Sequence, residues 1–351
     1  MKIFSIVGAR PQFIKLAPLS SALAGLHEEV IVHTGQHYDY AMSEKIFEDL
    51  GIRKPDVHLE ILPGSVTSQI TQMMLMLDSA MIKSKPDLVI VFGDTNSTFA
   101  GAMVAAKQNI PIVHIEAGLR SYNKAMPEEI NRVVTDHVSK YLFAPTQTAV
   151  DILMKEGLAE NSFFTGDIMV DTVKNNLQIA LSKSTIIEDL QLANEEYNLL
   201  TLHRNYNVDD TKVLEHLLNQ LGELNEKIIF PVHPRTRKML VDTYLIPKNI
   251  TVTDPQGYLD FIALENSAER IITDSGGIQK EAYILKKPCI TLRTETEWVE
   301  TVDEKWNLLI NPSEKNIASK IARFTPPENQ RDVFGKNVTQ KMVKIINDIS
   351  K

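Results

Sequence analysis

Short runs of β-branched and other apolar residues alternate with helical stretches along the whole chain, and this alternation restricts the fold more than any other feature. Such a pattern predicts parallel sheets covered by helices on both faces, because the crossover between parallel strands usually contains a helix. In the first half, strands are expected at Lys2–Val7, Glu29–His33, Asp87–Phe92, Ile112–Ile115 and Tyr141–Phe143. The pattern restarts in the second half, where strands are expected at Asn198–Leu202, Lys227–Pro231, Ile250–Thr253, Arg270–Thr273 and Cys289–Leu292.

The restart predicts two domains, which also suits a length of 351 residues. Residues 180–197, between the two sets of strands, are polar and low in glycine and are expected to form a helix and a connector. We therefore predict an α/β fold of two Rossmann-like doubly wound domains with a cleft between them. Residues 1–170 form the first domain and residues 171–334 the second, and a C-terminal helix at 335–351 packs back on the first.

Composition excludes several classes of protein. A net charge of −8 argues against nucleic-acid binding, which needs a basic face, and requires local basic groups around any anionic substrate. Cys289 is the only cysteine, which excludes a disulfide framework and a cysteine metal site and fits a reducing cytoplasm.

No membrane or export segment is expected. The apolar run Ile3–Val7 is too short for a signal-peptide core. The most apolar helical stretch, Ile70–Ile82, contains Gln72, Asp78 and Ser79, so it is expected to be a buried amphipathic helix.

Asp274-Ser275-Gly276-Gly277 follows an expected strand, and Glu281 comes one helical turn later. Glycines at a strand end let the backbone approach a ligand closely, and a helix that begins there points free N–H groups at an anion. A nucleotide diphosphate fits such a site, and Glu281 is placed to accept hydrogen bonds from ribose hydroxyls. An ordinary strand-to-helix turn capped by Ser275 explains the motif equally well.

Carboxylates follow successive strands of the first half. Asp94 and Glu116 each come directly after a strand, and Glu128 and Glu129 begin a helix at Pro127. Carboxylates that converge raise one another's pKa and can act as general acid and base. Two alternatives stay open: Asp94 as a helix N-cap, and one of the two glutamates as a purely structural group favoured by the helix dipole.

Basic residues follow other strand ends. Arg10 and Lys15 come after the first strand, in a segment with too few glycines for a dinucleotide fingerprint, and are expected to bind an anion or to lie on the helix surface. In the second half, His203 with Arg204 and His233 with Arg235 end consecutive strands and predict a cationic side for the cleft.

Metal and nucleophile sites are not expected. His33 and His37 are four residues apart, but they do not share a helix face, and there is no HExxH motif. Ser275 lacks the GxSxG elbow, and Cys289 lies within an apolar strand.

Together these motifs resemble the non-hydrolysing UDP-N-acetylglucosamine 2-epimerase family over nearly the whole chain. The matching stretches occur in the family's order: GARPQFIK, GDTNST, HIEAGLRS, PEEINR, LHRN, HPR, PQGY, DSGGIQKEA and TETE. The resemblance implies two domains of the glycosyltransferase-B type, a UDP-sugar substrate, a homodimer, and neither nicotinamide nor metal. It further implies epimerisation at C2 of a UDP-2-acetamido sugar, by elimination of UDP to a 2-acetamidoglucal and re-addition, for cell-surface polysaccharide synthesis.

The resemblance also implies roles for single residues. Asp94, Glu116 and Glu128 would be the acid/base carboxylates, and His203 would steady the departing diphosphate. The substrate would be bound by the motif residues Arg10, Lys15, Arg204, Gln256, Phe261, Ser275, Gly276, Gly277 and Glu281.

Two departures from the family pattern bear on substrate and regulation. Glu297 is followed by Trp298 instead of an Arg-Pro pair, and GARPQFIK replaces the commoner GTRPEAIK, which favours relatives that act on UDP-2,3-diacetamido-2,3-dideoxy-glucuronate. The C6 carboxylate of that sugar would need a cation such as Arg120, Arg235 or Arg293. The motifs of substrate-activated members are replaced by residues 36–39 and 64–65, so we expect little or no allosteric activation.

Three other functions are compatible with parts of the pattern. A glycosyltransferase of the same fold would share the nucleotide site but not the carboxylates, and a nucleotide-sugar sensor would lack one of them. A hydrolysing epimerase would have the same types of residue.

Overall fold

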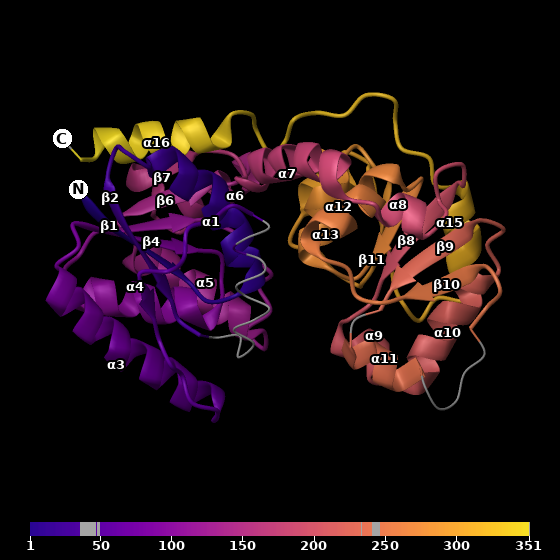
Figure 1. The fold of residues 1–351 in the computed structure, drawn as a ribbon, viewed down its shortest axis with the longest axis horizontal. Helices are drawn as coiled ribbons and strands as arrows, with labels where there is room; N and C mark the ends of the chain where they lie inside the picture. The colour runs from indigo at the N-terminus through magenta and orange to yellow at the C-terminus, as the bar shows by residue number, and fades with distance from the viewer. Residues whose placement is uncertain (36–46, 48–49, 233, 241–245, 351) are drawn as a thin grey trace. The chain divides into compact units, whose positions relative to one another are not determined.

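The computed structural model describes residues 1–35, 47, 50–232, 234–240 and 246–350, with the side chains of residues 234 and 235 excepted. Within it the chain forms two compact units (Figure 1). Unit 1 contains Met1–Thr172 and Asp332–Lys351, and unit 2 contains Val173–Arg331. Each unit is described by itself below.

Unit 1 is built on a seven-stranded sheet in the order β3-β2-β1-β4-β5-β6-β7, with every pair parallel. Its elements are β1 (Lys2–Val7), α1 (Arg10–Leu23), β2 (Glu28–His33), β3 (Val57–His58), α3 (Val66–Ser84), β4 (Leu88–Phe92), α4 (Asn96–Lys107), β5 (Ile112–Ile115), α5 (Pro127–Val138), β6 (Tyr141–Ala144), α6 (Gln147–Lys155), η1 (Ala159–Asn161), β7 (Ser162–Phe164) and α16 (Val338–Asp348). Helix α7 (Met169–Lys183) crosses the boundary between the units.

Unit 2 is built on a six-stranded parallel sheet in the order β10-β9-β8-β11-β12-β13. Its elements are α8 (Ile186–Asp189), β8 (Tyr197–Thr201), α9 (Asn205–Val208), α10 (Thr211–Gly222), β9 (Lys227–Pro231), α11 (Pro234–Leu240), β10 (Ile250–Thr253), α12 (Tyr258–Ser267), β11 (Arg270–Thr273), α13 (Gly276–Ile284), β12 (Cys289–Leu292), α14 (Val299–Asp303), β13 (Asn307–Ile310) and α15 (Ile317–Arg323).

The predicted fold class is confirmed: two parallel-sheet α/β domains. Every expected strand is present within one or two residues at its ends. Strands β3, β7 and β13 were not expected, and all three lie at the edge of a sheet. These strands are two to four residues long and partly exposed, whereas a central strand such as β4 has five residues that are all buried.

Both sheets reverse their strand order at one point, between β1 and β4 in unit 1 and between β8 and β11 in unit 2. The crossover helices leave in opposite directions from such a point, so a crevice opens beyond the carboxyl ends of the strands. The predicted site residues after these strands therefore lie where open α/β sheets bind ligands.

The amphipathic stretch expected at Ile70–Ile82 is part of α3. Met73, Leu77 and Met81, spaced four residues apart, are buried against the core of unit 1. In the part of the chain that the structure describes, no helix is long and apolar enough to cross a membrane.

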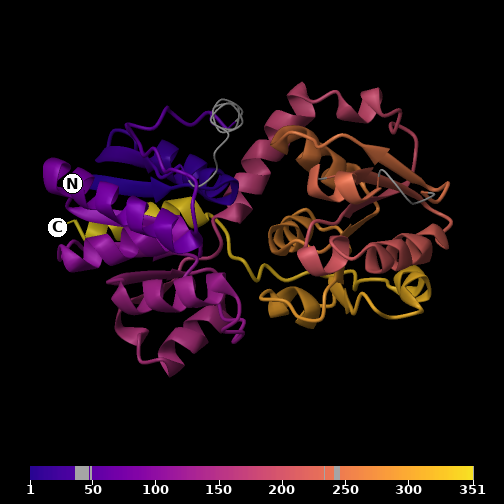
Figure 2. The same cartoon turned by 90° about the horizontal axis from the view of Figure 1, so that it is seen from below.

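The C-terminal segment belongs to unit 1, and α16 packs along α1 (Figures 1 and 2). His27 Nε2 lies 2.7 Å from Asn347 Oδ1, and the Thr339 amide donates to Asp171 at 2.7 Å. Gly166, at φ +90°, permits the close approach, since a Cβ there would lie 2.6 Å from the Phe334 carbonyl oxygen.

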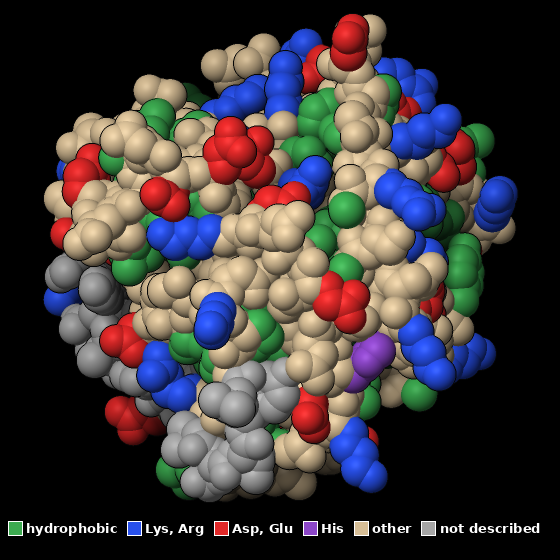
Figure 3. Space-filling view, turned by 90° about the vertical axis from the view of Figure 1, so that its right-hand side faces the viewer, with side chains coloured by type: hydrophobic (Ala, Val, Ile, Leu, Met, Phe, Trp, Pro, Cys, Tyr) green, Lys and Arg blue, Asp and Glu red, His purple; other side chains and the backbone are tan. Residues whose placement is uncertain are grey.

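Charge on the described surface is mixed in the view of Figure 3. Lysine and arginine side chains are interspersed with aspartate and glutamate there, and do not form a continuous basic face. That distribution agrees with the net charge of −8.

Candidate active site

The turn after β1 is held tightly against the start of α4. A Cβ on Gly8 would lie 2.0 Å from Thr34 Oγ1 and 2.2 Å from Ser97 Oγ, so no other residue fits without displacing both hydroxyl groups. Buried Gln12 accepts hydrogen bonds from the Gly8 amide at 2.8 Å and donates one to the Phe92 carbonyl at 2.9 Å. The side chain thus ties the ends of β1 and β4 together. Gln12 was not singled out from the sequence, although it lies within the GARPQFIK motif.

Lys15 and Glu116 form an ion pair beyond the ends of β1 and β5. Each side chain is 10% exposed. Glu116 has φ +76°, a left-handed conformation that costs a non-glycine residue about 1–3 kcal/mol. Arg10 begins α1 and is exposed.

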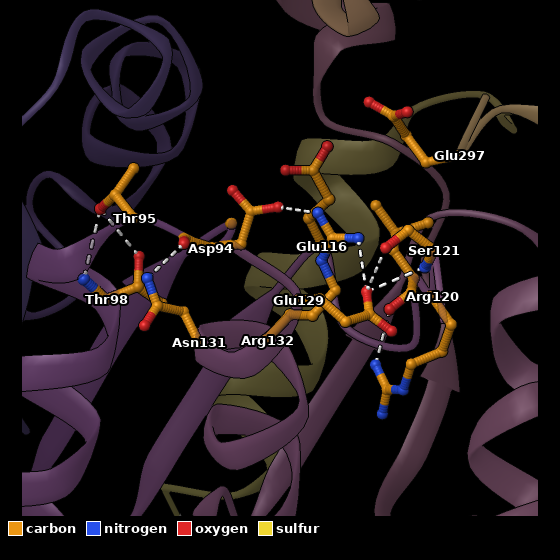
Figure 4. A network of polar contacts seen from close by, with 12 residues as sticks. Asp94, Thr95, Thr98, Glu116, Arg120, Ser121, Glu129, Asn131, Arg132 and Glu297 are labelled. Atoms are coloured by element: carbon orange, nitrogen blue, oxygen red, sulfur yellow. Dashed lines mark hydrogen bonds and ion pairs between the residues drawn. The ribbon is translucent and has the colours of Figure 1, made fainter. Parts of the chain in front are cut away.

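Asp94 pairs with Arg132, and its side chain is 31% exposed (Figure 4). The N-cap of α4 is Thr95, whose hydroxyl accepts from the Thr98 amide, so Asp94 does not cap the helix. Burial raises the pKa of Asp94 and Glu116 adds to the rise, while Arg132 and Lys15 act in the opposite direction. The net rise moves this carboxyl toward the range where an acid/base group can exchange a proton.

The two neighbouring glutamates of α5 have different surroundings. Glu129 is 3% exposed and accepts from the Ser121 amide at 2.8 Å, the Tyr122 amide at 2.9 Å and Arg132 at 3.0 Å. Burial would raise the pKa of Glu129, but these donors lower it below its ordinary value. Glu129 is therefore the structural member of the pair. Glu128 is partly exposed and forms no ion pair with the described residues, which leaves its carboxylate available for chemistry.

Three arginines were expected as candidates to bind a C6 carboxylate, and the structure describes the side chains of two of them. Both already pair with carboxylates of the protein. Arg120 is buried and binds Asp136 at 2.7 Å and Glu156 at 2.6 Å. Arg293 binds Glu297 at 3.0 Å. The Arg235 side chain lies outside the described residues, as do His233, His37 and residues 36–39.

In unit 2, a buried carboxylate holds the turn after β8. Asp274 is fully buried and accepts from the amides of His203 at 3.1 Å and Arg204 at 3.0 Å, and from Asn207 Nδ2 at 3.1 Å. Its Oδ1 also lies 3.2 Å from His203 Nδ1. Asp274 thus fixes the histidine and arginine that were expected to meet the diphosphate. The sequence did not reveal that Asp274 supports the predicted phosphate site, because the amide donors that it binds follow a different strand, β8.

Helix α13 begins at Gly276 without a side-chain cap. Ser275 is the N-cap residue, but its side chain makes no capping hydrogen bond, which removes the basis of the capped-turn alternative. The first N–H groups of the helix are therefore available to an anion. A Cβ on Gly276 would lie 2.2 Å from Glu297 Oε1, whereas one on Gly277 would have no neighbour closer than 3.9 Å.

Glu281 contacts the first residue of α12. Tyr258 donates a hydrogen bond to Glu281 Oε1 at 3.2 Å, and Glu281 is 6% exposed. Gln256 donates to the Asp254 carbonyl at 2.7 Å, and Phe261 lies one helical turn into α12, partly buried. Tyr258 is a further residue that the sequence did not indicate, although it ends the PQGY motif.

The other predictions concern metals and nucleophiles. Among the described residues, no cluster of histidine, cysteine and carboxylate side chains could hold a metal ion. Cys289 is 1% exposed, and burial raises the pKa of its thiol to about 12, so it is a core residue as expected.

Comparison with known proteins identifies the family. A sequence profile described as UDP-N-acetylglucosamine 2-epimerase matches residues 23–347. The chain belongs to the UDP-N-acetylglucosamine 2-epimerase family. This is a family of isomerases, and the resemblance drawn from the sequence motifs is confirmed.

Relatives and solved structures cover the whole chain. A UDP-N-acetylglucosamine 2-epimerase homolog from Methanococcus maripaludis is 48% identical over 99% of this chain and 100% of that protein. A UDP-2,3-diacetamido-2,3-dideoxy-D-glucuronate 2-epimerase from Pseudomonas aeruginosa is 42% identical over 96% of this chain and 94% of that protein. The crystal structure of the Methanocaldococcus jannaschii UDP-GlcNAc 2-epimerase in complex with UDP-GlcNAc and UDP has a TM-score of 0.90 at 40% identity, covering 99% and 100% of the two chains. The two domains are thus those of the family's glycosyltransferase-B type fold.

Proposed function

We propose that this chain inverts C2 of a UDP-2-acetamido sugar, interconverting UDP-N-acetylglucosamine and UDP-N-acetylmannosamine without hydrolysis. The observation that carries the proposal is the carboxylate rim of unit 1, with Asp94 after β4, Glu116 after β5 and Glu128 in the first turn of α5. Asp94 has a raised pKa. Glu116 has a left-handed backbone conformation and pairs with Lys15, and Glu128 forms no ion pair with the described residues.

In the proposed reaction, one carboxylate removes the C2 proton while the C1–O bond to UDP breaks. The electron pair of the C–H bond forms the C1=C2 double bond of a 2-acetamidoglucal, and UDP takes the electrons of the broken bond. UDP then re-adds to C1, and a carboxylic acid on the opposite face delivers a proton to C2. An unactivated C–H bond requires positioned acid and base groups, which the rim supplies.

Unit 2 is proposed to hold UDP. The Ser275–Gly277 turn would bind the diphosphate through N–H groups at the start of α13, with His203 and Arg204 opposing the charge that develops as UDP leaves. Glu281 would accept from the ribose hydroxyls, and Gln256 and Phe261 would line the uracil pocket. Arg10 and Lys15 would meet the diphosphate and the sugar.

The sugar is the finer part of the proposal. Relatives with the two different substrate names are about equally similar to this chain, so similarity does not separate them. The pairing of Arg120 and Arg293 with carboxylates favours a sugar without a charged C6 group. Trp298 occupies the position where the family pattern has an arginine, and it is 3% exposed. The Lys280 ammonium nitrogen lies 4.1 Å from the centroid of its ring.

Proton NMR of UDP-N-acetylglucosamine with the purified protein in deuterated water tests the function. We expect deuterium at C2 and a new anomeric signal of UDP-N-acetylmannosamine. Free N-acetylmannosamine with UDP would instead identify a hydrolysing enzyme. Exchange only with UDP-2,3-diacetamido-2,3-dideoxy-glucuronate would select that substrate, and no exchange with either sugar would refute the function.

Two further properties follow from the sequence. Without the activation motifs, the reverse reaction should depend hyperbolically on substrate when UDP-N-acetylglucosamine is omitted, and sigmoidal dependence would contradict this. The expected homodimer should appear in sedimentation equilibrium as twice the chain mass of 39.5 kDa.

A further inference from the structure

A buried hydrogen-bonded chain lies behind the carboxylate rim. His114, in β5, is fully buried. Its Nδ1 lies 2.6 Å from Asp136 Oδ1, and its Nε2 lies 2.7 Å from the Gly93 carbonyl oxygen. A carbonyl oxygen can only accept a hydrogen bond, and so can an ionised carboxylate. A neutral imidazole has one N–H, so both contacts together require a proton on each ring nitrogen.

One arginine and two carboxylates belong to the same hydrogen-bonded group as this ring. Asp136 also accepts from Arg120 at 2.7 Å and from the Gly118 amide at 3.1 Å, and Arg120 binds Glu156 at 2.6 Å. An imidazolium gives this group two cations and two carboxylates, and of the two carboxylates Asp136 is buried whereas the Glu156 side chain is 25% exposed. Burial would raise the pKa of Asp136, but the facing His114 and Arg120 lower it below its ordinary value.

The ring binds the turn before Asp94 directly and the turn after Glu116 through Asp136. Gly93, whose carbonyl oxygen it binds, has φ +61° and directly precedes Asp94. Asp136, which the ring holds in place, binds the amide of Gly118, two residues after the left-handed Glu116. The Lys15–Glu116 pair is the charged group that faces the Gly93 turn from the other side. Rotation of the ring or loss of one proton would release one turn or the other.

We infer that His114 is a positioning residue of this site, an imidazolium held by Asp136 that fixes the turns of Asp94 and Glu116 in register. The inference rests on the proposed function for its effect on turnover. The protonation and the fixing of the turns are measured without turnover.

NMR of the full-length wild-type chain, labelled with ¹⁵N at histidine, tests whether both nitrogens of the His114 ring carry protons. His114→Gln assigns the signals by their loss, and exposed His137 on α5 is the internal control. We expect both His114 nitrogens to carry protons at neutral pH. One unprotonated His114 nitrogen at neutral pH would overturn the inference.

The positioning role is tested by kinetics and amide exchange. For His114→Gln we expect kcat to fall by about 10- to 100-fold, since small displacements of catalytic groups have such effects, with KM within about twofold of wild type. The Gly118 amide should exchange faster than in the wild type, and His137→Gln should match the wild type in all respects. Wild-type kcat and wild-type exchange in His114→Gln would overturn the role.

Asp136→Asn provides the same comparison through the partner side chain if His114→Gln does not fold. Failure of the proposed function is a separate result, namely the absence of C2 deuterium in the wild type with either sugar. In that case the ring spectrum and the Gly118 exchange rate still decide whether His114 holds the turns.

Discussion

The switch points of the two units share a backbone plan but are built from different groups. In unit 1, charged side chains from several elements pair with one another, as in Lys15–Glu116 and Asp94–Arg132. In unit 2, one buried carboxylate, Asp274, gathers backbone N–H groups, and glycines lie at the start of α13. Both arrangements occur at the same place in a parallel sheet.

The difference separates proton transfer from anion binding. Paired carboxylates can change protonation when a neighbouring charge moves, which is what an acid/base site requires. Backbone N–H groups cannot change protonation, and they are already oriented, so they suit a diphosphate that must be held without reacting. Substitutions at the rim of unit 1 should therefore reduce turnover, and substitutions in unit 2 should reduce UDP affinity.

The largest effect is expected at Glu116. Glu116→Gln keeps the size of the side chain and removes its ability to exchange a proton, so kcat should fall by about 10²- to 10⁴-fold. UDP affinity, measured by calorimetry, should be unchanged, as should both properties in the exposed control Glu160→Gln. Turnover near the wild-type rate would remove Glu116 from the mechanism.

The neighbouring glutamates sharpen the comparison within unit 1. Glu129→Gln should lower the free energy of unfolding by about 1.5–3 kcal/mol at pH 7, because charged hydrogen bonds are lost. The lowered pKa of Glu129 sets the sign: its contribution is complete above the ordinary value of 4.5 and is lost as the pH falls through the lower folded value. Denaturant unfolding at several pH values measures this.

Glu128→Gln is the matched control for that experiment. It should leave the free energy of unfolding within about 0.5 kcal/mol of wild type, as for surface changes, and should reduce kcat. If Glu128→Gln is fully active and Glu129→Gln is stable but inactive, the assignment of the two glutamates is reversed.

In unit 2, Glu281→Ala should weaken UDP binding by about 1.5–3 kcal/mol if hydrogen bonds from the ribose to a charged group are lost. Tyr258→Phe removes the hydroxyl that orients Glu281 and should have a smaller effect in the same direction. The exposed Glu269→Ala serves as the control. Unchanged affinity in Glu281→Ala would place the ribose elsewhere.

The smallest effect is expected at the glycines of α13. An added methyl group at Gly276 meets Glu297, which Arg293 holds, so Gly276→Ala should weaken UDP binding by about 1 kcal/mol. Gly277→Ala has no close neighbour and should bind UDP as tightly as the wild type. Equal losses in both variants would indicate that the backbone, not the contact with Glu297, limits binding.

Much of the fold could be predicted because each central parallel strand appears in the sequence as an apolar run bounded by glycine and polar residues. The edge strands β3, β7 and β13 could not, since they are only two to four residues long and partly exposed, which leaves little local pattern. The sequence analysis placed the boundary between the domains after residue 170, with a helix and a connector at residues 180–197, and the compact units divide after Thr172, inside α7. A helix that continues through a boundary leaves no break in its local pattern.

By itself, the sequence determined the family, the two parallel sheets and the types of residue at each strand end, because motif order and strand periodicity are properties of the chain alone. Only the tertiary structure showed which hydrogen-bond donors and charges surround each carboxylate. It separated Glu129 from Glu128, excluded Asp94 as a helix cap, and showed Gln12, Tyr258 and Asp274 as supports. The role of a polar side chain depends on the donors, charges and burial around it, and in a parallel α/β fold these come from segments far apart in sequence.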